Sequence, residues 1–306
     1  MSSWGGESGL MEAEAPSIGN IRPITNREFQ LLRSFIYREA GIHLSETKRA
    51  LVVGRLSKRL RELGLKTFGA YYEHLEAGDS GERVLMLDAI STNETHFFRE
   101  PRHFSLLEET ILPRFVREAE AGRRPKRIRI WSAACSTGEE PYSVAMVLRS
   151  FFPPASGWDL EILATDLSSR VLRAARDAEW PVGKAAEIPD VHLRQFMLRG
   201  TRSQEGKMKA GPEIRSMVRF ERLNLHKDPY PTGPFDLIFC RNVLIYFSHE
   251  AKVAVVHRLL GQMARDGYFF LGHAETLSGI ADHVRSVGPN VYMPSGRPKG
   301  EVRPPA

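Results

Sequence analysis

Hydrophobic residues recur at helical spacing through the first third of the chain. One helix is predicted to begin near Glu28, with Thr25 or Asn26 as its cap, and to end at Gly41. The same period predicts further helices near residues 45–63, 68–75 and 83–90. Residues 21–90 are therefore expected to form an all-helical N-terminal domain.

From about residue 105 the pattern changes to short apolar runs that alternate with helical patterns. The strand candidates are residues 128–132, 160–165, 236–241, 268–272 and, with a weaker pattern, 290–293. This alternation predicts an α/β fold with a doubly wound, parallel sheet, spanning residues 91–295. Short β-like runs with Gly- and Lys-rich turns at about 196–225 indicate a small antiparallel β insertion.

Both ends of the chain differ in composition from the rest. Residues 1–20 are expected to be a disordered tail and residues 296–306 a flexible one, because Gly, Ser, Glu or Pro dominate them. The 42% hydrophobic and 26% charged residues are typical of a soluble globular protein. Without a secretory signal or a membrane span, and with only Cys135 and Cys240, the chain is expected in the reducing cytoplasm.

The net charge of +6 comes from one segment. Residues 48–66 contain seven basic residues and one acidic residue. Four of the basic residues form a stripe beside the apolar face of the predicted helix: Lys48, Arg55, Arg59 and Lys66. Such a stripe is often only a solvated helix face, but the scarcity of acids favours an acidic partner.

The sequence W-S-A-A-C-S-T-G-E-E-P-Y (131–142) lies between a predicted strand and a predicted helix. Doubly wound folds bind cofactors at such junctions, and small residues let the backbone approach a ligand closely. A phosphate-binding loop would not carry two carboxylates, Glu139 and Glu140, at a helix N-terminus. The loop therefore favours a nucleotide-like cofactor with a cationic part, such as S-adenosylmethionine.

Polar residues follow the predicted strands. Asp166 ends the second strand, where an acid can accept hydrogen bonds from ribose hydroxyls, although it could instead cap the next helix. Arg241 and Asn242 end a later strand, where ligands bind, although Arg241 could form an ordinary surface salt bridge. Asn224 could contact an adenine edge. Three further polar residues lie on the loop between the domains, where function or helix capping could explain them: Asn93, Thr95 and Arg99.

Five segments, taken in order, resemble the chemotaxis receptor methyltransferases of the CheR family. They are T-N-E-T-H-F-F-R-E (92–100), W-S-A-A-C-S-T-G-E-E-P-Y-S (131–143), A-T-D-L-S (164–168), F-D-L-I-F-C-R-N-V-L-I-Y-F (235–247) and G-Y-F-F-L-G-H-A-E (267–275). The resemblance implies an S-adenosylmethionine-dependent methyltransferase fold behind a helical domain. It also implies methylation of glutamate γ-carboxylates on receptor cytoplasmic helices, giving glutamyl methyl esters for sensory adaptation.

The resemblance also implies roles for particular residues. Asn93, Thr95 and Arg99 would line the mouth of the site, while Glu140 and Asp166 would hold the methionine amine and the ribose. Four residues would close around the adenosine and the methionine end: Asn224, Leu225, Arg241 and Asn242. Tyr246 would lie near the transferred methyl group, which makes Arg99 and Tyr246 the catalytic candidates.

The resemblance extends to partners. The basic helix, through Lys48, Arg55, Arg59 and Lys66, would face acidic receptor helices. The β insertion resembles a subdomain that docks a receptor's C-terminal peptide in some members, and whether it does so here is left open by Arg202, Lys207 and Lys209. The chain is expected to be a monomer that neither binds nucleic acid nor inserts into a membrane. No metal ion is expected, because no histidine or cysteine spacing is typical of a metal site.

Other functions fit the residues less well. The basic helix would suit a nucleic-acid methyltransferase, but residues 241–243 have neither an Asn/Asp-Pro-Pro-aromatic nor a Pro-Cys step. A nicotinamide dehydrogenase would need G-x-G-x-x-G after the first strand, which the chain lacks. A non-enzymatic signalling adaptor that binds the cofactor remains open.

Overall fold

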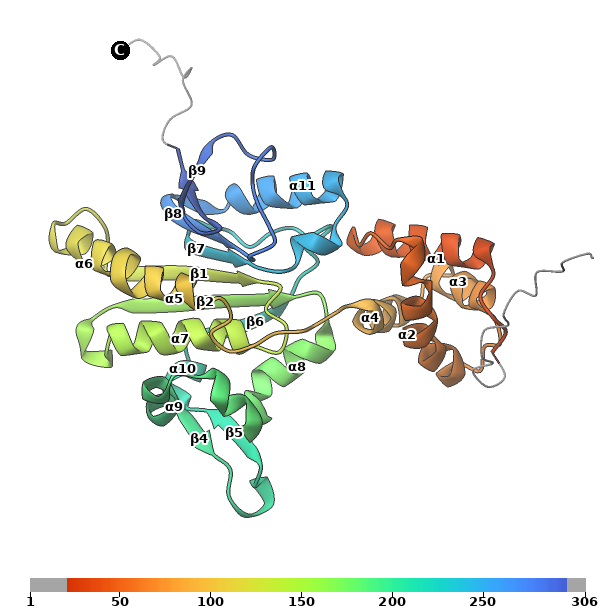
Figure 1. Cartoon of the computed structure of the whole chain (residues 1–306), viewed down its shortest axis with the longest axis horizontal. Coiled ribbons are helices and arrows are strands. Elements are labelled where there is room, and N and C mark those ends of the chain that lie inside the picture. The colour runs from red at the N-terminus through yellow and green to blue at the C-terminus, as the bar shows by residue number, and fades with distance from the viewer. Residues whose placement is uncertain (1–20, 296–306) are drawn as a thin grey trace, which may run out of the picture. The chain divides into compact units, whose positions relative to one another are not determined.

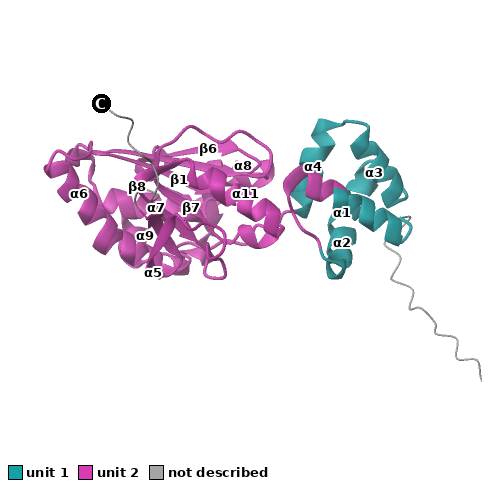
Figure 2. Ribbon diagram, turned by 90° about the horizontal axis from the view of Figure 1, so that it is seen from above, with its two compact units in different colours: residues 1–34, 45–90 teal, residues 35–44, 91–306 magenta. Residues whose placement is uncertain are grey.

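The computed structural model describes residues 21–295 (Figure 1), and the two predicted tails, residues 1–20 and 296–306, lie outside the described residues. Contacts divide the chain into two compact units (Figure 2). The helical unit contains residues up to 34 together with 45–90, and the sheet unit contains residues 35–44 together with 91 onward. The end of the first helix therefore belongs to the sheet unit, although the sequence predicted a single boundary at residue 90.

The helical unit contains the helices that the apolar period predicted. Their bounds are α1 (Asn26–Ala40), α2 (Arg49–Glu62), α3 (Phe68–Glu76) and α4 (Ser80–Ile90). Thr25 caps α1, because its hydroxyl accepts a hydrogen bond from the Glu28 amide at 3.2 Å while the Glu28 carboxylate accepts one from the Thr25 amide at 2.8 Å. This reciprocal capping box satisfies amides that a helix start leaves unpaired.

The sheet unit is built on a seven-stranded sheet whose first five strands are parallel. In spatial order the strands are β6 (Val218–Arg222), β2 (Asp159–Asp166), β1 (Arg127–Ala133), β7 (Phe235–Cys240), β8 (Met263–Leu271), β10 (Val291–Pro294) and β9 (Val284–Gly288). Strand β10 runs antiparallel to both of its neighbours. Within residues 21–295, no helix is long and apolar enough to cross a membrane.

Helices cover both faces of this sheet. Ile128 and Ile130 of β1 pack in one core with α5, α6 and α7, whereas Trp131 of the same strand packs in a second core with α11. The alternation follows from the two-residue period of a strand. The helices of the sheet unit are α5 (Pro101–Leu106), α6 (Leu112–Glu120), α7 (Glu139–Phe151), α8 (Ser169–Asp177), α9 (Asp190–Phe196), α10 (Pro212–Arg215) and α11 (His249–Leu260).

A second, three-stranded antiparallel sheet is present, but its bounds differ from the expected 196–225. It consists of β3 (Glu179–Pro181), β5 (Lys207–Ala210) and β4 (Met197–Arg199) in that order. It begins earlier because Glu179–Pro181, too short to show a pattern, pairs with β5. It ends earlier because β6 pairs with β2 from Ile162↔Val218 to Asp166↔Arg222 and so belongs to the main sheet.

The strand order fixes where a ligand can bind. The chain passes from β1 outward to β2 and β6, and then returns to place β7 on the other side of β1. Such a reversal leaves a crevice at the carboxyl ends of the two central strands, because the connections leave in opposite directions. The predicted site residues after β1 and β7 therefore lie at one switch point.

Candidate cofactor and active site

The loop after β1 has an irregular backbone that turns back toward the end of β2. Ala134, Ser136 and Gly138 all have positive φ, at 68°, 51° and 96°. The Cys135 amide donates to the Thr165 carbonyl at 2.9 Å. A Cβ on Gly138 would lie 3.1 Å from the side chain of Ala175, so glycine suits this position in both backbone angle and space.

Asp166 joins this loop to the end of β2. Its carboxylate accepts a hydrogen bond from the Ser136 amide and another from the Ser168 amide, both at 2.9 Å. The alternative that Asp166 caps the next helix is wrong, since the Ser168 side chain caps α8 by accepting from the Val171 amide. These two hydrogen bonds place the carboxylate where the loop after β1 meets the end of β2.

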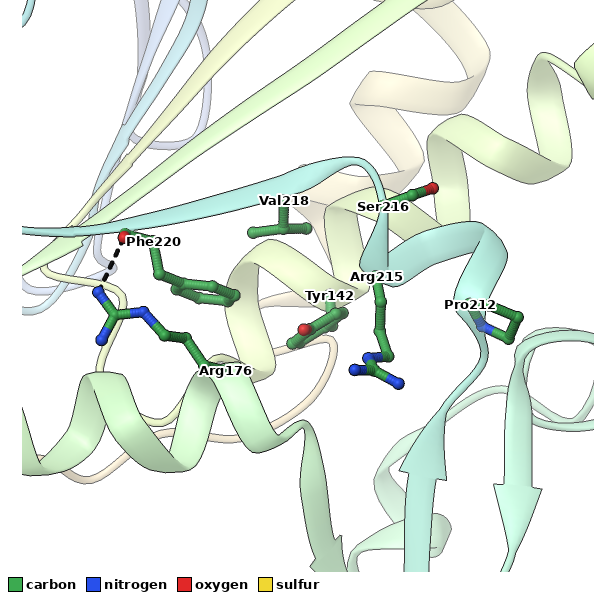
Figure 3. Close-up of a pocket in the computed structure, with 7 residues that line it drawn as sticks. All are labelled: Tyr142, Arg176, Pro212, Arg215, Ser216, Val218 and Phe220. Atoms are coloured by element: carbon green, nitrogen blue, oxygen red, sulfur yellow. Dashed lines mark hydrogen bonds between the residues drawn. The ribbon is translucent and has the colours of Figure 1, made fainter.

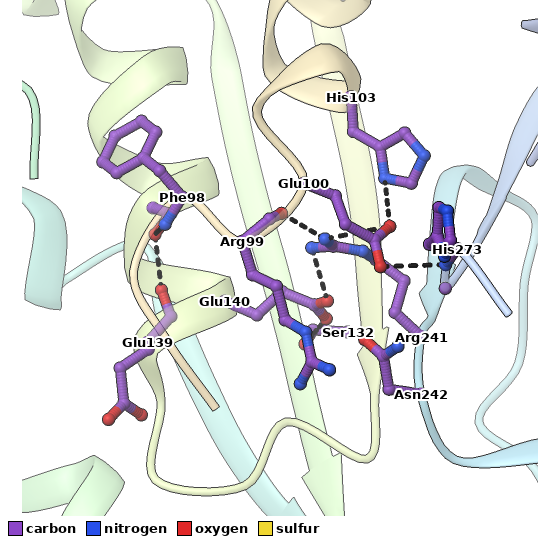
Figure 4. A network of polar contacts seen from close by, with 12 residues as sticks. Phe98, Arg99, Glu100, His103, Ser132, Glu139, Glu140, Arg241, Asn242 and His273 are labelled. Atoms are coloured by element: carbon purple, nitrogen blue, oxygen red, sulfur yellow. Dashed lines mark hydrogen bonds and ion pairs between the residues drawn. The ribbon is translucent and has the colours of Figure 1, made fainter. Parts of the chain in front are cut away.

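Arg241 is the centre of a buried ionic network (Figure 4). Its side chain is 2% exposed and forms ion pairs with Glu140 at 3.2 Å and Glu100 at 3.3 Å. It also donates to the Arg99 carbonyl. The reading of Arg241 as a surface salt bridge is therefore wrong. The guanidinium ties the end of β7 to the first turn of α7 and to the segment before α5.

The pKa values of the two carboxylates in this network shift in opposite directions. Burial raises the pKa of Glu140, although Arg241 and the Ser132 hydroxyl, which donates at 2.7 Å, oppose the shift. Burial also acts to raise the pKa of Glu100, but Arg241, the His273 amide and His103 outweigh it and leave this pKa below its usual value. Each charged group in this network needs its ion-pair partner, because an unpaired buried charge is costly.

Glu275 shapes the turn after β7, and the sequence reasoning assigned it no role. Its carboxylate, 4% exposed as a residue, accepts hydrogen bonds from three backbone amides, those of Asn242, Leu244 and Gly272, at 2.7–2.8 Å. A Cβ on Gly272 would lie 2.4 Å from the Asn242 side-chain nitrogen. Only its place in the resembling segment 267–275 could have indicated it, since a glutamate that binds backbone amides has no spacing signature.

The segment of residues 93–99 lies against the cofactor loop. The Ser136 hydroxyl donates to the Asn93 carbonyl at 3.0 Å, and the Phe98 amide donates to the Ser143 hydroxyl at 3.0 Å. A pocket of about 460 Å³ beside it is lined by Asn93, Thr95, Thr137, Glu139, Trp180 and Lys184, among others. The structure therefore brings Asn93 and Thr95 together with the loop after β1.

Arg99 has a different environment from Arg241. Its Nη1 donates to the Glu94 carbonyl at 3.2 Å, and Figure 4 marks no hydrogen bond or ion pair from its guanidinium to Glu100 or Glu140. The side chain is half-buried. Arg99 is therefore held by a backbone contact and not by the buried carboxylates beside it.

Asn224, Leu225 and Tyr246 flank β7 on its two connections. The Asn224 amide donates to the Glu39 carbonyl at 2.7 Å, and its side-chain oxygen accepts from the His226 amide at 2.9 Å. The half-buried Tyr246 ends a short turn, and its carbonyl accepts from the His43 amide at 2.8 Å. The segment of residues 35–44 thus contacts both connections. These two bonds use half of the hydrogen-bonding capacity of the Asn224 side chain, which leaves one donor and one acceptor site.

Two further features help to delimit the site. A separate pocket of about 520 Å³ between α7, α8, α10 and β6 contains none of the predicted site residues (Figure 3). Burial raises the pKa of both the Cys135 and Cys240 thiols, so neither is a ready nucleophile. Within residues 21–295, no three His, Cys, Asp or Glu side chains form a group that could hold a metal ion.

The residues at the switch point fit S-adenosylmethionine. The side-chain nitrogen of Asn93 is buried and has no hydrogen-bond partner within residues 21–295. Such an unpaired donor costs stability unless a ligand supplies an acceptor. The carboxylates of Glu140 and Asp166 suit the cationic methionine end and the ribose hydroxyls. These residues could hold the cofactor between the loop after β1, the end of β2 and the segment 93–99.

Comparisons with known proteins identify a family of methyltransferases. The CheR methyltransferase all-alpha domain matches residues 27–91, and the CheR methyltransferase SAM-binding domain matches residues 93–293. The chain is 40% identical to chemotaxis protein methyltransferase 2 of Pseudomonas aeruginosa, over 89% of this chain and 94% of that one. It is 38% identical to the chemotaxis protein methyltransferase of Escherichia coli, over 88% and 91%.

These matches confirm the resemblance drawn from the five segments, the predicted fold class and S-adenosylmethionine as the methyl donor. They also favour a chemotaxis methyltransferase over a dehydrogenase or a nucleic-acid methyltransferase. The chain therefore belongs to the CheR methyltransferase family, the S-adenosylmethionine-dependent methyltransferases of chemotaxis.

Proposed function

We propose that this chain methylates glutamate γ-carboxylates on the cytoplasmic helices of chemotaxis receptors, and thereby forms glutamyl methyl esters for sensory adaptation. One observation carries the assignment of the site. Asp166, the loop after β1 and the segment 93–99 meet at the switch point, in a chain of this family. The proposal includes a monomeric enzyme that works in the cytoplasm, because the receptor helices lie there.

The chemistry requires positioning more than acid–base catalysis. A glutamate side chain has a pKa near ~4.3, so it is ionised at neutral pH and needs no general base. When bound, S-adenosylmethionine supplies an activated methyl group on a sulfonium. The protein's task is then to align a carboxylate with that group and to exclude water.

Within this proposal, Arg99 orients the incoming carboxylate. Its planar fork can form two parallel hydrogen bonds to a carboxylate, and its guanidinium forms no ion pair with Glu100 or Glu140 in Figure 4. Tyr246 is proposed to lie beside the transferred methyl group. Glu140 is proposed to hold the methionine amine through lone pairs that Ser132 and Arg241 leave unused.

The receptor-facing surface needs revision from the predicted stripe. The Arg59 guanidinium binds the buried Glu82 carboxylate, with Nε–Oε1 at 3.0 Å, and Arg55 donates to the Ile90 carbonyl. Both side chains therefore help to hold the helical unit together. We propose that the exposed basic residues of this segment attract the acidic receptor: Lys48, Lys58, Arg61 and Lys66.

The test is an assay of methyl transfer to receptors. Purified protein is incubated with tritiated S-adenosylmethionine and membranes that contain chemotaxis receptors, and the label is then treated with base. Methyl esters release the label as methanol, so the proposal predicts base-labile label on receptor polypeptides. Base-stable label on RNA or DNA would contradict it in favour of a nucleic-acid methyltransferase. Tight cofactor binding without any transfer would instead support the adaptor.

A further inference from the structure

Residues 179–187, which comprise β3 and the turn Val182–Glu187, hold the segment 93–99 from the side of the small sheet. None of these residues was a candidate for the site in the sequence. The Trp180 ring packs edge-on against the Phe97 ring, with centroids 4.9 Å apart, and both side chains are buried. The segment 93–99, which carries proposed substrate and cofactor contacts, is therefore supported by the small sheet and not by the main sheet alone.

Lys184 connects three parts of the site. Its ammonium donates to Glu139 at 2.6 Å and to the Thr95 carbonyl at 3.0 Å. The Glu139 side chain is 1% exposed and follows the cofactor loop directly, so a cation beside it offsets much of the cost of burying its charge. A single side chain thereby fixes Thr95 relative to the start of α7.

Glu187 makes a second attachment three residues later. Its carboxylate accepts a hydrogen bond from the Phe97 amide at 2.9 Å, and its other oxygen lies 3.4 Å from Nδ1 of His96. Lys184 and Glu187 thus bind backbone atoms two residues apart on the segment that carries Asn93, Thr95 and Arg99. Backbone attachment sets the position of the segment whatever its side chains do.

We propose that Lys184, with Glu187, is a positioning residue for methyl transfer. It holds Thr95 and Asn93 against the cofactor loop, and so increases affinity for S-adenosylmethionine without touching the reacting atoms. The proposal rests on the cofactor-binding part of the proposed function and is independent of the methyl acceptor.

The test measures cofactor affinity by calorimetry, without receptor. Lys184→Met keeps the length of the side chain and removes the charge, and it should weaken binding of S-adenosylmethionine and of S-adenosylhomocysteine about 10-fold or more. Glu187→Gln should weaken binding in the same direction but less. The matched control is Lys209→Met, which removes an exposed ion pair with Glu179 on the same small sheet and should leave affinity unchanged.

A double variant separates positioning from charge neutralisation. Lys184→Met combined with Glu139→Gln removes the buried charge that Lys184 had neutralised. It should recover thermal stability and still bind the cofactor weakly, because Thr95 has lost its anchor. Recovery of both stability and affinity would overturn the proposal, as would wild-type affinity in Lys184→Met. If Lys184→Met fails to fold, Glu187→Gln and the double variant carry the same test.

Hydrogen exchange gives an independent readout. The amides of residues 95–98 should exchange faster in folded Lys184→Met than in the wild type, while those of β1 and β2 stay protected. Unchanged exchange at residues 95–98 would contradict a positioning role. A wild type that binds the cofactor but fails to methylate receptors would refute the proposed acceptor and leave this inference standing.

Discussion

At the scale of single residues, Asp166 offers the sharpest test, because its carboxylate binds the loop after β1 and is also proposed to bind the ribose. Asp166→Asn keeps the shape but replaces one acceptor oxygen with a donor facing a backbone amide. Hydrogen bonds to charged groups contribute roughly 1.5–3 kcal/mol each, so affinity for S-adenosylmethionine should fall at least ~10-fold. Calorimetry measures this, with the exposed Asp177→Asn as control. Wild-type affinity would remove Asp166 from the site.

Arg99 should behave differently, since its proposed partner is the substrate carboxylate. Arg99→Ala is expected to reduce turnover with receptor membranes far more than it reduces cofactor affinity. Arg99→Lys should restore activity only in part, because lysine lacks the planar fork. Steady-state rates and calorimetry on the same preparations separate the two effects. A parallel loss of both would place Arg99 in the cofactor pocket.

Several site residues could be predicted from the sequence because they lie at strand ends. Other site residues could not be predicted, because their role is to bind backbone atoms. Asp166, Arg241 and Asn242 each follow a buried strand, and parallel strands end at one edge. Lys184 and Glu275 bind buried carboxylates or backbone amides from segments without a regular period. The buried character of Arg241 was also beyond reach, because Glu100 and Glu140 come from distant parts of the chain.

At the scale of elements, the loop after β1 can be tested through its glycine. Gly138 and Gly122 both have positive φ, and alanine there should cost each backbone roughly 1–2 kcal/mol. A Cβ on Gly122 would meet nothing within 4 Å, whereas one on Gly138 would press on Ala175 and Tyr142. Both alanine variants should therefore lose stability, and only Gly138→Ala should also lose cofactor affinity. Equal affinities would mean that the loop conformation does not matter for binding.

Helix α2 offers a matched pair of charge reversals. The double variant Lys58→Glu with Arg61→Glu changes only exposed side chains. It should methylate receptors more slowly than the wild type at low salt, and the difference should become smaller at high salt, because salt screens surface charges. Its affinity for the cofactor should be unchanged. Arg59→Glu would place a like charge beside the buried Glu82 and should lower the melting temperature instead. Unchanged methylation in the first variant at low salt would reduce the basic segment to a solvated surface.

Element positions were predicted well where the pattern was long and poorly where it was short. The strands β2 and β7 contain runs of consecutive apolar residues, and their places in the sheet follow from alternation with helices. Strand β6 was assigned to the insertion, because Val218–Arg222 alternates apolar and charged residues like an antiparallel strand. Its parallel pairing with β2 is set by the chain's return path, which no local pattern records.

At the scale of the whole molecule, three histidines with a lowered pKa predict a loss of stability in mild acid. Burial lowers the pKa of His103, His192 and His226 below the usual 6.5, with Arg241 adding to the effect at His103. The unfolded chain takes up these protons below about pH 6.5 and the folded chain does so only at lower pH. The free energy of unfolding should therefore fall as pH decreases through this range.

Urea unfolding at about pH 7.5 and about pH 5.5 measures this decline. His192→Gln should make the decline shallower, because it removes one of the three groups. A free energy of unfolding that stays level between the two pH values would contradict the lowered pKa of these three histidines.

In the proposed function, a receptor glutamate receives the methyl group at this switch-point site. The most direct measurement is mass spectrometry of receptor peptides after incubation with S-adenosylmethionine that carries a trideuterated methyl group. With the wild type, we expect a mass increase of one trideuteromethyl group per modified peptide, located on glutamate side chains. With Arg99→Ala this label should be strongly reduced. Label on another residue type, or equal label with Arg99→Ala, would contradict it.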